Sequence, residues 1–376
     1  MNREFERALE HLLSPDERIS LAMLYHLSAM TDDEQRRFAA VWPRVRPTKR
    51  RRAVRMMAEL AEDDVYADFT AVFRLALEDE DAEVRAVAVD GLWEDESVSL
   101  ITPLLRLLHS DPSEAVRARA AAALGRFVLA GELGHLSEKR ARTVVEALIR
   151  VISDGSLSTE LRRRAVESVA YSSDARVRGI IGRAYRDVNR KMRVSAIFAM
   201  GRSADPYWCD IVGRELESDD PEMRYEAARA AGELGDKRAV GRLIALLEDD
   251  DPEVREVAIW SLGEIGGKRA YRALNALLRH DDPGVVEAAQ EALAMLKLNE
   301  GLFDPTSFVD LSFDLEHVGV VVDGYGSDVA LFPEELYDFH IVQPEDDEDE
   351  VEDEEWEWEE GYGDAYGDAY DEDESG

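Results

Sequence analysis

The densest group of chemically active side chains in this sequence is a run of basic residues near the N-terminus. Such a cluster can bind phosphate groups or an acidic protein surface. The same run can also be a solvated helix face that is neutralised by nearby carboxylates such as Glu59, Glu62 and Asp63. Both interpretations stay open, and the candidate partner-binding residues are Arg44, Arg46, Lys49, Arg50, Arg51, Arg52 and Arg55.

Residues that commonly bind metals or act as nucleophiles are sparse in this chain. The sequence has no C-x-x-C, H-x-x-x-H or G-x-x-x-x-G-K-S/T motif, and none of its seven histidines is followed by glutamate. We therefore expect no metal, no other cofactor and no catalytic residue. The single cysteine, Cys209, lies between Asp205 and Asp210. Because activation of a thiol needs cationic neighbours, a buried and unreactive thiol is favoured.

The distribution of charge disfavours nucleic acid as a partner. The 376 residues include 45 basic and 82 acidic side chains, which give a net charge of −37. No basic residue follows Lys297, so residues 1–298 are close to balance and residues 299–376 are strongly acidic. Nucleic-acid affinity comes largely from neutralising phosphates with basic side chains. A protein partner is the better expectation.

The last 33 residues, 344–376, form what we call the acidic tail, which is predicted to be disordered because its composition cannot bury a core. It can serve only solubility, or it can bind a basic protein with aromatic anchors among its carboxylates. Folding back onto the basic run is disfavoured by the short reach of such a chain. The candidate anchors are Trp356, Trp358 and Tyr362.

The elements that carry these residues follow an internal repeat of about 31 residues. One arginine recurs in most units, namely Arg85, Arg117, Arg162, Arg193, Arg224 and Arg255. An alanine recurs at Ala88, Ala120, Ala165, Ala196, Ala227, Ala258 and Ala289. Before each unit's second helix stands a capping residue: Asp81, Ser113, Ser158, Asn189, Asp220, Asp251 or Asp282. The longer interval between Arg117 and Arg162 places an insertion near residues 128–137.

Each unit is predicted to be a helical hairpin that cannot cover its own apolar face, so neighbouring hairpins must stack. The stretch from Gly232 to Arg255 resembles the short HEAT-like repeats of the phycobilisome-lyase type. This resemblance implies an all-α solenoid. It also implies that the recurring arginines pair with aspartates, such as Asp79 or Asp249, in a structural ladder. Arginines facing one groove for nucleic acid are the competing interpretation.

The predicted organisation has four parts. Residues 1–65 form a helical cap, in which Thr31 to Glu34 make a capping box and Thr48 caps the next helix. Residues 66–298 form about seven HEAT-like repeats. Residues 299–343 form an irregular C-terminal cap segment, and residues 344–376 form the acidic tail.

The favoured function is a non-enzymatic scaffold or adaptor that binds proteins on a concave solenoid surface. The alternative is an enzyme or enzyme subunit of the bilin-lyase HEAT type, for which the resemblance is the only support. The N-terminal residues alternate in charge and lack the apolar region of a signal peptide, so a cytoplasmic location is expected. No apolar run approaches the roughly 20 residues of a membrane helix.

Overall fold

The computed structural model describes residues 2–16 and 18–299, and within these ranges the regular structure is helical, with no strand. The first four α-helices are α1 (Arg3–Leu13), α2 (Leu21–Tyr25), α3 (Asp32–Val41) and α4 (Pro47–Asp63). The all-α solenoid predicted from the sequence is confirmed for this part of the chain. Residues 300–376 lie outside the described residues. They include the predicted cap segment 299–343 apart from Asn299, and the acidic tail with its candidate anchors Trp356, Trp358 and Tyr362.

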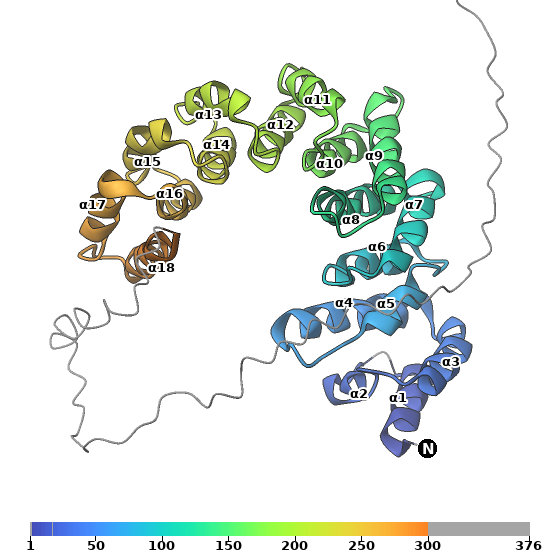
Figure 1. The fold of residues 1–376 in the computed structure, drawn as a ribbon. Helices are drawn as coiled ribbons and strands as arrows, with labels where there is room; N and C mark the ends of the chain where they lie inside the picture. Colours follow the sequence, from blue (N-terminus) through green and yellow to red (C-terminus); the bar gives the residue numbers. More distant parts are fainter. Residues whose placement is uncertain (1, 17, 300–376) are drawn as a thin grey trace, which may run out of the picture. The chain divides into compact units, whose positions relative to one another are not determined.

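The helices that follow alternate between two rows (Figure 1). Row A contains α5 (Thr70–Ala76), α7 (Ile101–Ser110), α9 (Glu138–Ser153), α11 (Ala175–Tyr185), α13 (Cys209–Glu215), α15 (Val240–Leu246) and α17 (Gly267–Leu277). Row B contains α4 followed by α6 (Ala82–Gly91), α8 (Glu114–Glu132), α10 (Thr159–Val169), α12 (Arg190–Arg202), α14 (Pro221–Glu233), α16 (Pro252–Ile265) and α18 (Pro283–Asn299). From α6 to α16, each row B helix packs against the next helix in its row and against the row A helix that precedes it in the chain.

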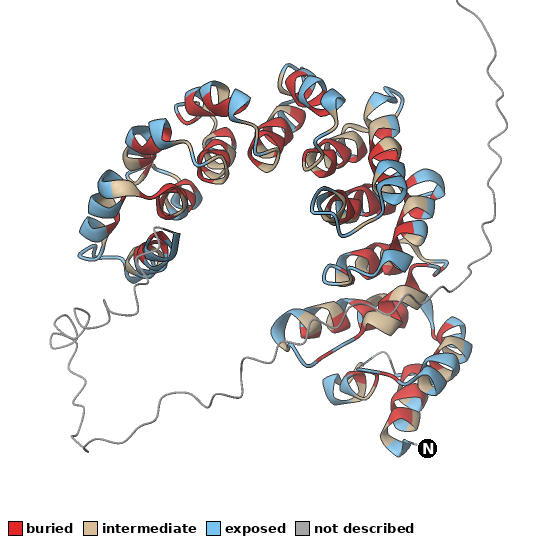
Figure 2. Ribbon diagram, in the orientation of Figure 1, coloured by how far each residue is buried: buried red, intermediate tan, exposed pale blue. Residues whose placement is uncertain are grey.

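The core lies between the two rows, where buried residues face one another (Figure 2). All seven recurring alanines are on row B helices, and each is fully buried. Glycine plays the same part at nearby positions. A Cβ atom on Gly263 would lie 2.8 Å from the backbone oxygen of Ala292 on the next helix. Small side chains therefore allow successive row B helices to approach closely.

The predicted helix starts are found with two differences. Asp81, Asn189 and Asp251 each accept hydrogen bonds from the first turn of their helix, as expected of an N-cap. Ser113 occupies the N-cap position of α8, but its side chain makes no capping hydrogen bond. The prediction for Thr48 is wrong: α4 begins at Pro47, because proline fits the first turn of a helix, where no N–H donor is needed.

The insertion predicted near residues 128–137 lengthens two helices. α8 has 19 residues and α9 has 16, whereas α14 and α13 have 13 and 7. The turn between α8 and α9 includes Gly134 at a φ of 78°, a conformation that suits glycine. The capping box from Thr31 to Glu34 is confirmed at the start of α3.

Candidate functional site

Two of the ladder arginines join one repeat to the next through a carboxylate. Arg85 donates hydrogen bonds of 2.7 and 2.8 Å to the two carboxylate oxygens of Asp111, and another of 2.7 Å to the backbone oxygen of Asp79. Arg224 repeats this arrangement, with bonds of 2.7 and 2.8 Å to Asp249. Each guanidinium group thus links two hairpins with the paired geometry that makes such bonds strong.

The other four ladder arginines donate to backbone oxygens at the end of the preceding helix or in the turn after it. Arg193 donates to Asp187 at 3.0 Å, and Arg255 donates to Asp249 at 2.7 Å. Arg117 and Arg162 donate to Leu108 at 2.9 Å and to Ile152 at 3.2 Å. All six guanidinium groups therefore contact groups of the protein itself. We predict that these contacts hold the repeats in register.

The basic run divides into a buried part and a surface part. Lys49 is fully buried, and its Nζ donates to the backbone oxygen of Asp16 at 2.9 Å and to Ser14 Oγ at 3.0 Å. Arg50 is 2% exposed and lies 3.1 Å from a carboxylate oxygen of Asp79. Lys49 therefore links α4 to the loop after α1, and Arg50 links α4 to the first repeat. Neither presents its charge to solvent.

The other five basic residues lie at or near the surface, with Arg51, Arg52 and Arg55 on α4 and the other two just before it. Arg51 pairs with Asp81 at 3.0 Å, and Arg55 pairs with Glu83. Arg46 donates to the backbone oxygen of Pro15 at 2.8 Å. Arg44, Arg46, Arg52 and Arg55 are exposed. They remain candidates for contact with a partner.

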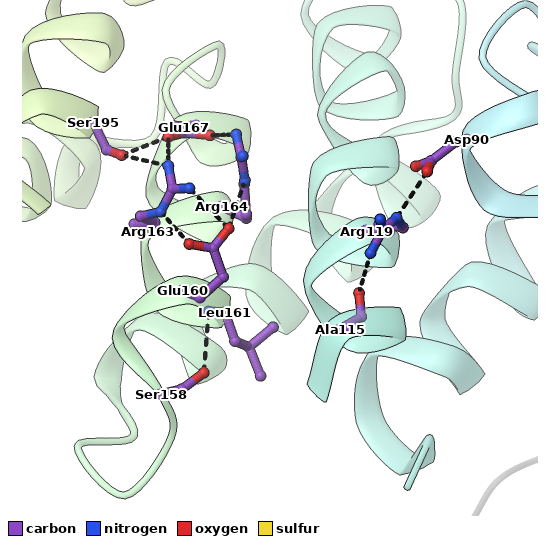
Figure 3. Close-up of polar contacts among 10 residues, drawn as sticks. All are labelled: Asp90, Ala115, Arg119, Ser158, Glu160, Leu161, Arg163, Arg164, Glu167 and Ser195. Atoms are coloured by element: carbon purple, nitrogen blue, oxygen red, sulfur yellow. Dashed lines mark hydrogen bonds and ion pairs between the residues drawn. The ribbon is translucent and has the colours of Figure 1, made fainter. Parts of the chain in front are cut away.

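The middle of row B carries its own neutralising ion pairs on the exposed face. Figure 3 shows Arg119 of α8 against Asp90 of α6, with an Nε to Oδ2 distance of 2.7 Å. On α10, Arg163 and Arg164 both contact Glu160 and Glu167 (Figure 3). Since each of these charged groups already has an opposite charge beside it, this stretch offers little to a charged ligand.

A groove of about 890 Å³ follows on the same row, over α12, α14, α16 and α18. We call it the α16 groove. Its apolar wall includes Tyr225, Trp260 and Met295, of which Trp260 is 39% and Met295 is 40% exposed. Its carboxylates are Glu233, Glu253, Glu256, Glu264 and Glu291.

The charges of the α16 groove are only partly balanced. Glu233 lies 3.0 Å from Arg229 and 3.4 Å from Arg202, which are the two arginines of the lining. Across the described ranges, no basic side chain forms an ion pair with the other four carboxylates, and none lies over the Trp260 ring. The α16 end of the groove therefore presents negative charge beside an exposed aromatic ring.

The sequence contained a signal for this groove that our interpretation did not use. Glu253, Glu256, Trp260 and Glu264 recur at helical spacing on one helix. The opposite stripe of this helix is apolar and includes the buried residues Val254 and Leu262. An aromatic residue within the polar stripe is the feature that could have indicated a binding surface.

A carboxyl group with a raised pKa, Glu226, lies beside the α16 groove. Burial, together with the nearby carboxylates of Glu167 and Glu233, raises the pKa of Glu226 to about 7. Its Oε2 atom is buried, and no residue within 2–16 and 18–299 forms a hydrogen bond with it. Burial also raises the pKa of Glu233, against the opposing effect of Arg202. This part of α14 is therefore sensitive to pH near neutrality.

The structure also bears on the reactivity of Cys209, on metal binding and on membrane spans. Cys209 is buried, and burial together with Asp236 raises the pKa of its thiol, although Arg238 lies nearby. A raised pKa reduces the fraction of reactive thiolate. In residues 2–16 and 18–299, no cluster of histidine, cysteine or acidic side chains has the arrangement of a metal site. The helices described there are too short or too polar to cross a membrane.

Several solved structures resemble this chain at low sequence identity. Human deoxyhypusine hydroxylase is 18% identical, with 78% of this chain and 96% of that chain covered and a TM-score of 0.31. The complex of CpcE and CpcF of phycocyanin lyase from Nostoc sp. is 18% identical, with coverage of 61% and 93% and a TM-score of 0.40. YibA of Escherichia coli is 20% identical, with coverage of 76% and 99% and a TM-score of 0.41.

A match to a family of repeats comes from the sequence itself. No curated protein matches this chain. Residues 69–154 and 210–294 match the family model of HEAT repeats. The first stretch contains α5 to α9, and the second contains α14 to α17 and the first part of α18. The two stretches that match HEAT repeats therefore lie within the all-helical solenoid.

Proposed function

We propose that this protein is a scaffold that binds another protein through the α16 groove. The observation that carries this proposal is the exposed Trp260 ring, which lies among four carboxylates that have no ion-pair partner in the described residues. In the middle of row B, by contrast, Arg119 pairs with Asp90, and Arg163 pairs with Glu160. An exposed aromatic side chain in a hollow is typical of the residues that dominate protein interfaces.

The scaffold is further assigned to the short HEAT-like repeat type of the phycobilisome lyases, because its step is 31 residues. A non-enzymatic role is favoured over a lyase-type enzyme. The exposed residues Arg44, Arg46, Arg52 and Arg55, together with Trp356, Trp358 and Tyr362, are proposed as secondary contacts. A basic protein fits the acidic tail as well as the groove.

Affinity capture with the full-length chain and a Trp260→Ala variant tests the proposal. Trp93 provides a matched control, because it is 58% exposed but follows α6 outside the α16 groove. We expect a protein retained by the parent chain and by Trp93→Ala to be lost with Trp260→Ala. Equal retention by all three chains would contradict the proposed surface.

A further inference from the structure

The molecule itself shows how an aromatic ring on row B accommodates positive charge. Phe198 of α12 has two guanidinium groups over its ring: Arg202 at 5.2 Å and Arg229 at 5.0 Å from the ring centre. Arg202 lies one turn further along α12, and Arg229 lies on the next row B helix. Both arginines also contact Glu233. An aromatic face, two cations and a carboxylate thus form a closed cluster.

Two repeats later, the same positions carry the opposite charge. With the 31-residue step, Phe198 corresponds to Trp260, Arg202 to Glu264 and Arg229 to Glu291. The aromatic residue is kept, but glutamates replace both arginines that cover it. The ring of Trp260 is consequently exposed, and its neighbours attract a cation instead of supplying one.

The charge and shape of a cationic group determine how well it fits over Trp260 and between the neighbouring glutamates. A guanidinium group is planar, stacks on aromatic rings and binds carboxylates through paired hydrogen bonds, whereas an ammonium group is a compact and strongly hydrated charge. Glu256 and Glu253 extend the negative surface along α16. Phosphate-bearing ligands such as nucleic acids would meet repulsion from these carboxylates.

We infer that the α16 groove binds an arginine-bearing segment of a partner protein, with one guanidinium group over Trp260 and between Glu264 and Glu291. This inference rests on the proposed scaffold function and specifies the chemistry of its partner. The partner's arginine takes the place that Arg202 and Arg229 occupy at Phe198.

The test is a titration of a fluorescent, otherwise neutral peptide containing several arginines against the full-length chain at physiological ionic strength. A second peptide carries citrulline, the neutral analogue of arginine, at the same positions. We expect the arginine peptide to bind at least about tenfold more tightly. Trp260→Ala and Glu264→Gln should each weaken its binding by about fivefold or more. Equal binding of both peptides would overturn the inference.

The acidic tail also attracts a basic peptide, so the variants must separate the two contributions. The tail is the same in every variant, and Glu248→Gln removes one exposed carboxylate from the loop after α15, outside the groove. We expect Glu248→Gln to bind the arginine peptide like the parent chain. If it weakens binding as much as Glu264→Gln, binding reflects overall charge and the inference fails.

A charge reversal supplies a second and independent readout. The double variant Glu264→Arg with Glu291→Arg places around Trp260 two arginines at the positions of those that cover Phe198. We expect this variant to keep its helical circular dichroism and to lose binding of the arginine peptide. Retained binding would overturn the inference. Capture of a partner that depends on Trp260, without binding of the arginine peptide, would leave the scaffold proposal standing and refute the inference alone.

Discussion

At the scale of single residues, arginine has two separate uses in this protein. Arg224 links neighbouring hairpins through Asp249, and this contact holds the pKa of Asp249 below its ordinary value. Arg202 and Arg229 instead cover an aromatic ring on the exposed face of row B. The first use concerns the assembly of the solenoid, and the second concerns what its surface offers to a ligand.

The contacts of Arg224 lead to a prediction about stability. Replacing Arg224 with alanine leaves Asp249 without its paired donor and removes a bond of 2.8 Å to the backbone oxygen of Ser218. We expect a loss of about 1 to 3 kcal/mol in the free energy of unfolding, measured by chemical denaturation. The control is Arg242→Ala, because its ion pair among the described residues is with exposed Glu217 and should contribute less than about 1 kcal/mol. Equal effects would refute the ladder.

Glu226 leads to a prediction about pH. Its pKa is about 7 in the folded chain and near the ordinary 4.5 in the unfolded chain, so the folded state binds its proton more tightly. This contribution to stability is present below about pH 4.5 and is lost as the pH rises through 7. We expect Glu226→Gln to raise the melting temperature at pH 8. The corresponding gain in the free energy of unfolding is up to about 3 kcal/mol.

The same Glu226→Gln variant should change the melting temperature little at pH 4, where the parent side chain is already protonated. Glu248→Gln, at an exposed position, serves as the control at both pH values. A gain for Glu226→Gln that is equal at pH 4 and pH 8 would show that burial of the charge is not its cause.

At the scale of helices, close packing along row B depends on residues without bulk. A Cβ atom on Gly263 would meet the backbone oxygen of Ala292 at 2.8 Å and its Cα at 3.0 Å. Because both neighbours belong to the backbone, α18 would have to move to accept a side chain. The spacing of these helices is therefore controlled by a few small residues.

We expect Gly263→Ala to destabilise the protein by about 1 to 3 kcal/mol, as overpacking of a tight contact does. Gly213→Ala is the matched control. Gly213 also lies in a helix, but its nearest neighbour would be the end of the Arg242 side chain at 3.7 Å, which is an ordinary contact. Thermal unfolding compares the two variants. Equal melting temperatures would contradict this account of row B packing.

At the scale of the whole molecule, the chain combines a nearly balanced helical array with a strongly acidic end. The described helices run from Arg3 to Asn299. The acidic tail, in contrast, has 19 acidic residues among 33 and no basic residue. We expect a chain that ends at Gln343 to keep the helical circular dichroism of the full chain on a per-molecule basis. A clear loss of helical signal would refute the predicted disorder of residues 344–376.

The sequence by itself determined the features that are local or that recur. The 31-residue step, the caps at residues such as Asp81 and Asp251, and the row of buried alanines were all predicted. Helix starts depend on a few consecutive residues, and a repeated small residue indicates a repeated close contact. The fold class therefore followed without any knowledge of which helices meet.

Only the tertiary structure decided which charged side chains bind groups within the protein and which are exposed to solvent or to a ligand. In the sequence, Lys49 and Arg52 belong to one basic run, yet Lys49 is buried among backbone oxygens while Arg52 lies on the surface. Trp260 and Glu291 are 31 residues apart, and they share a groove because α16 packs against α18. The reason is physical: the free energy of a charged side chain depends on its solvation and its neighbours, and both are set by the packing of distant segments.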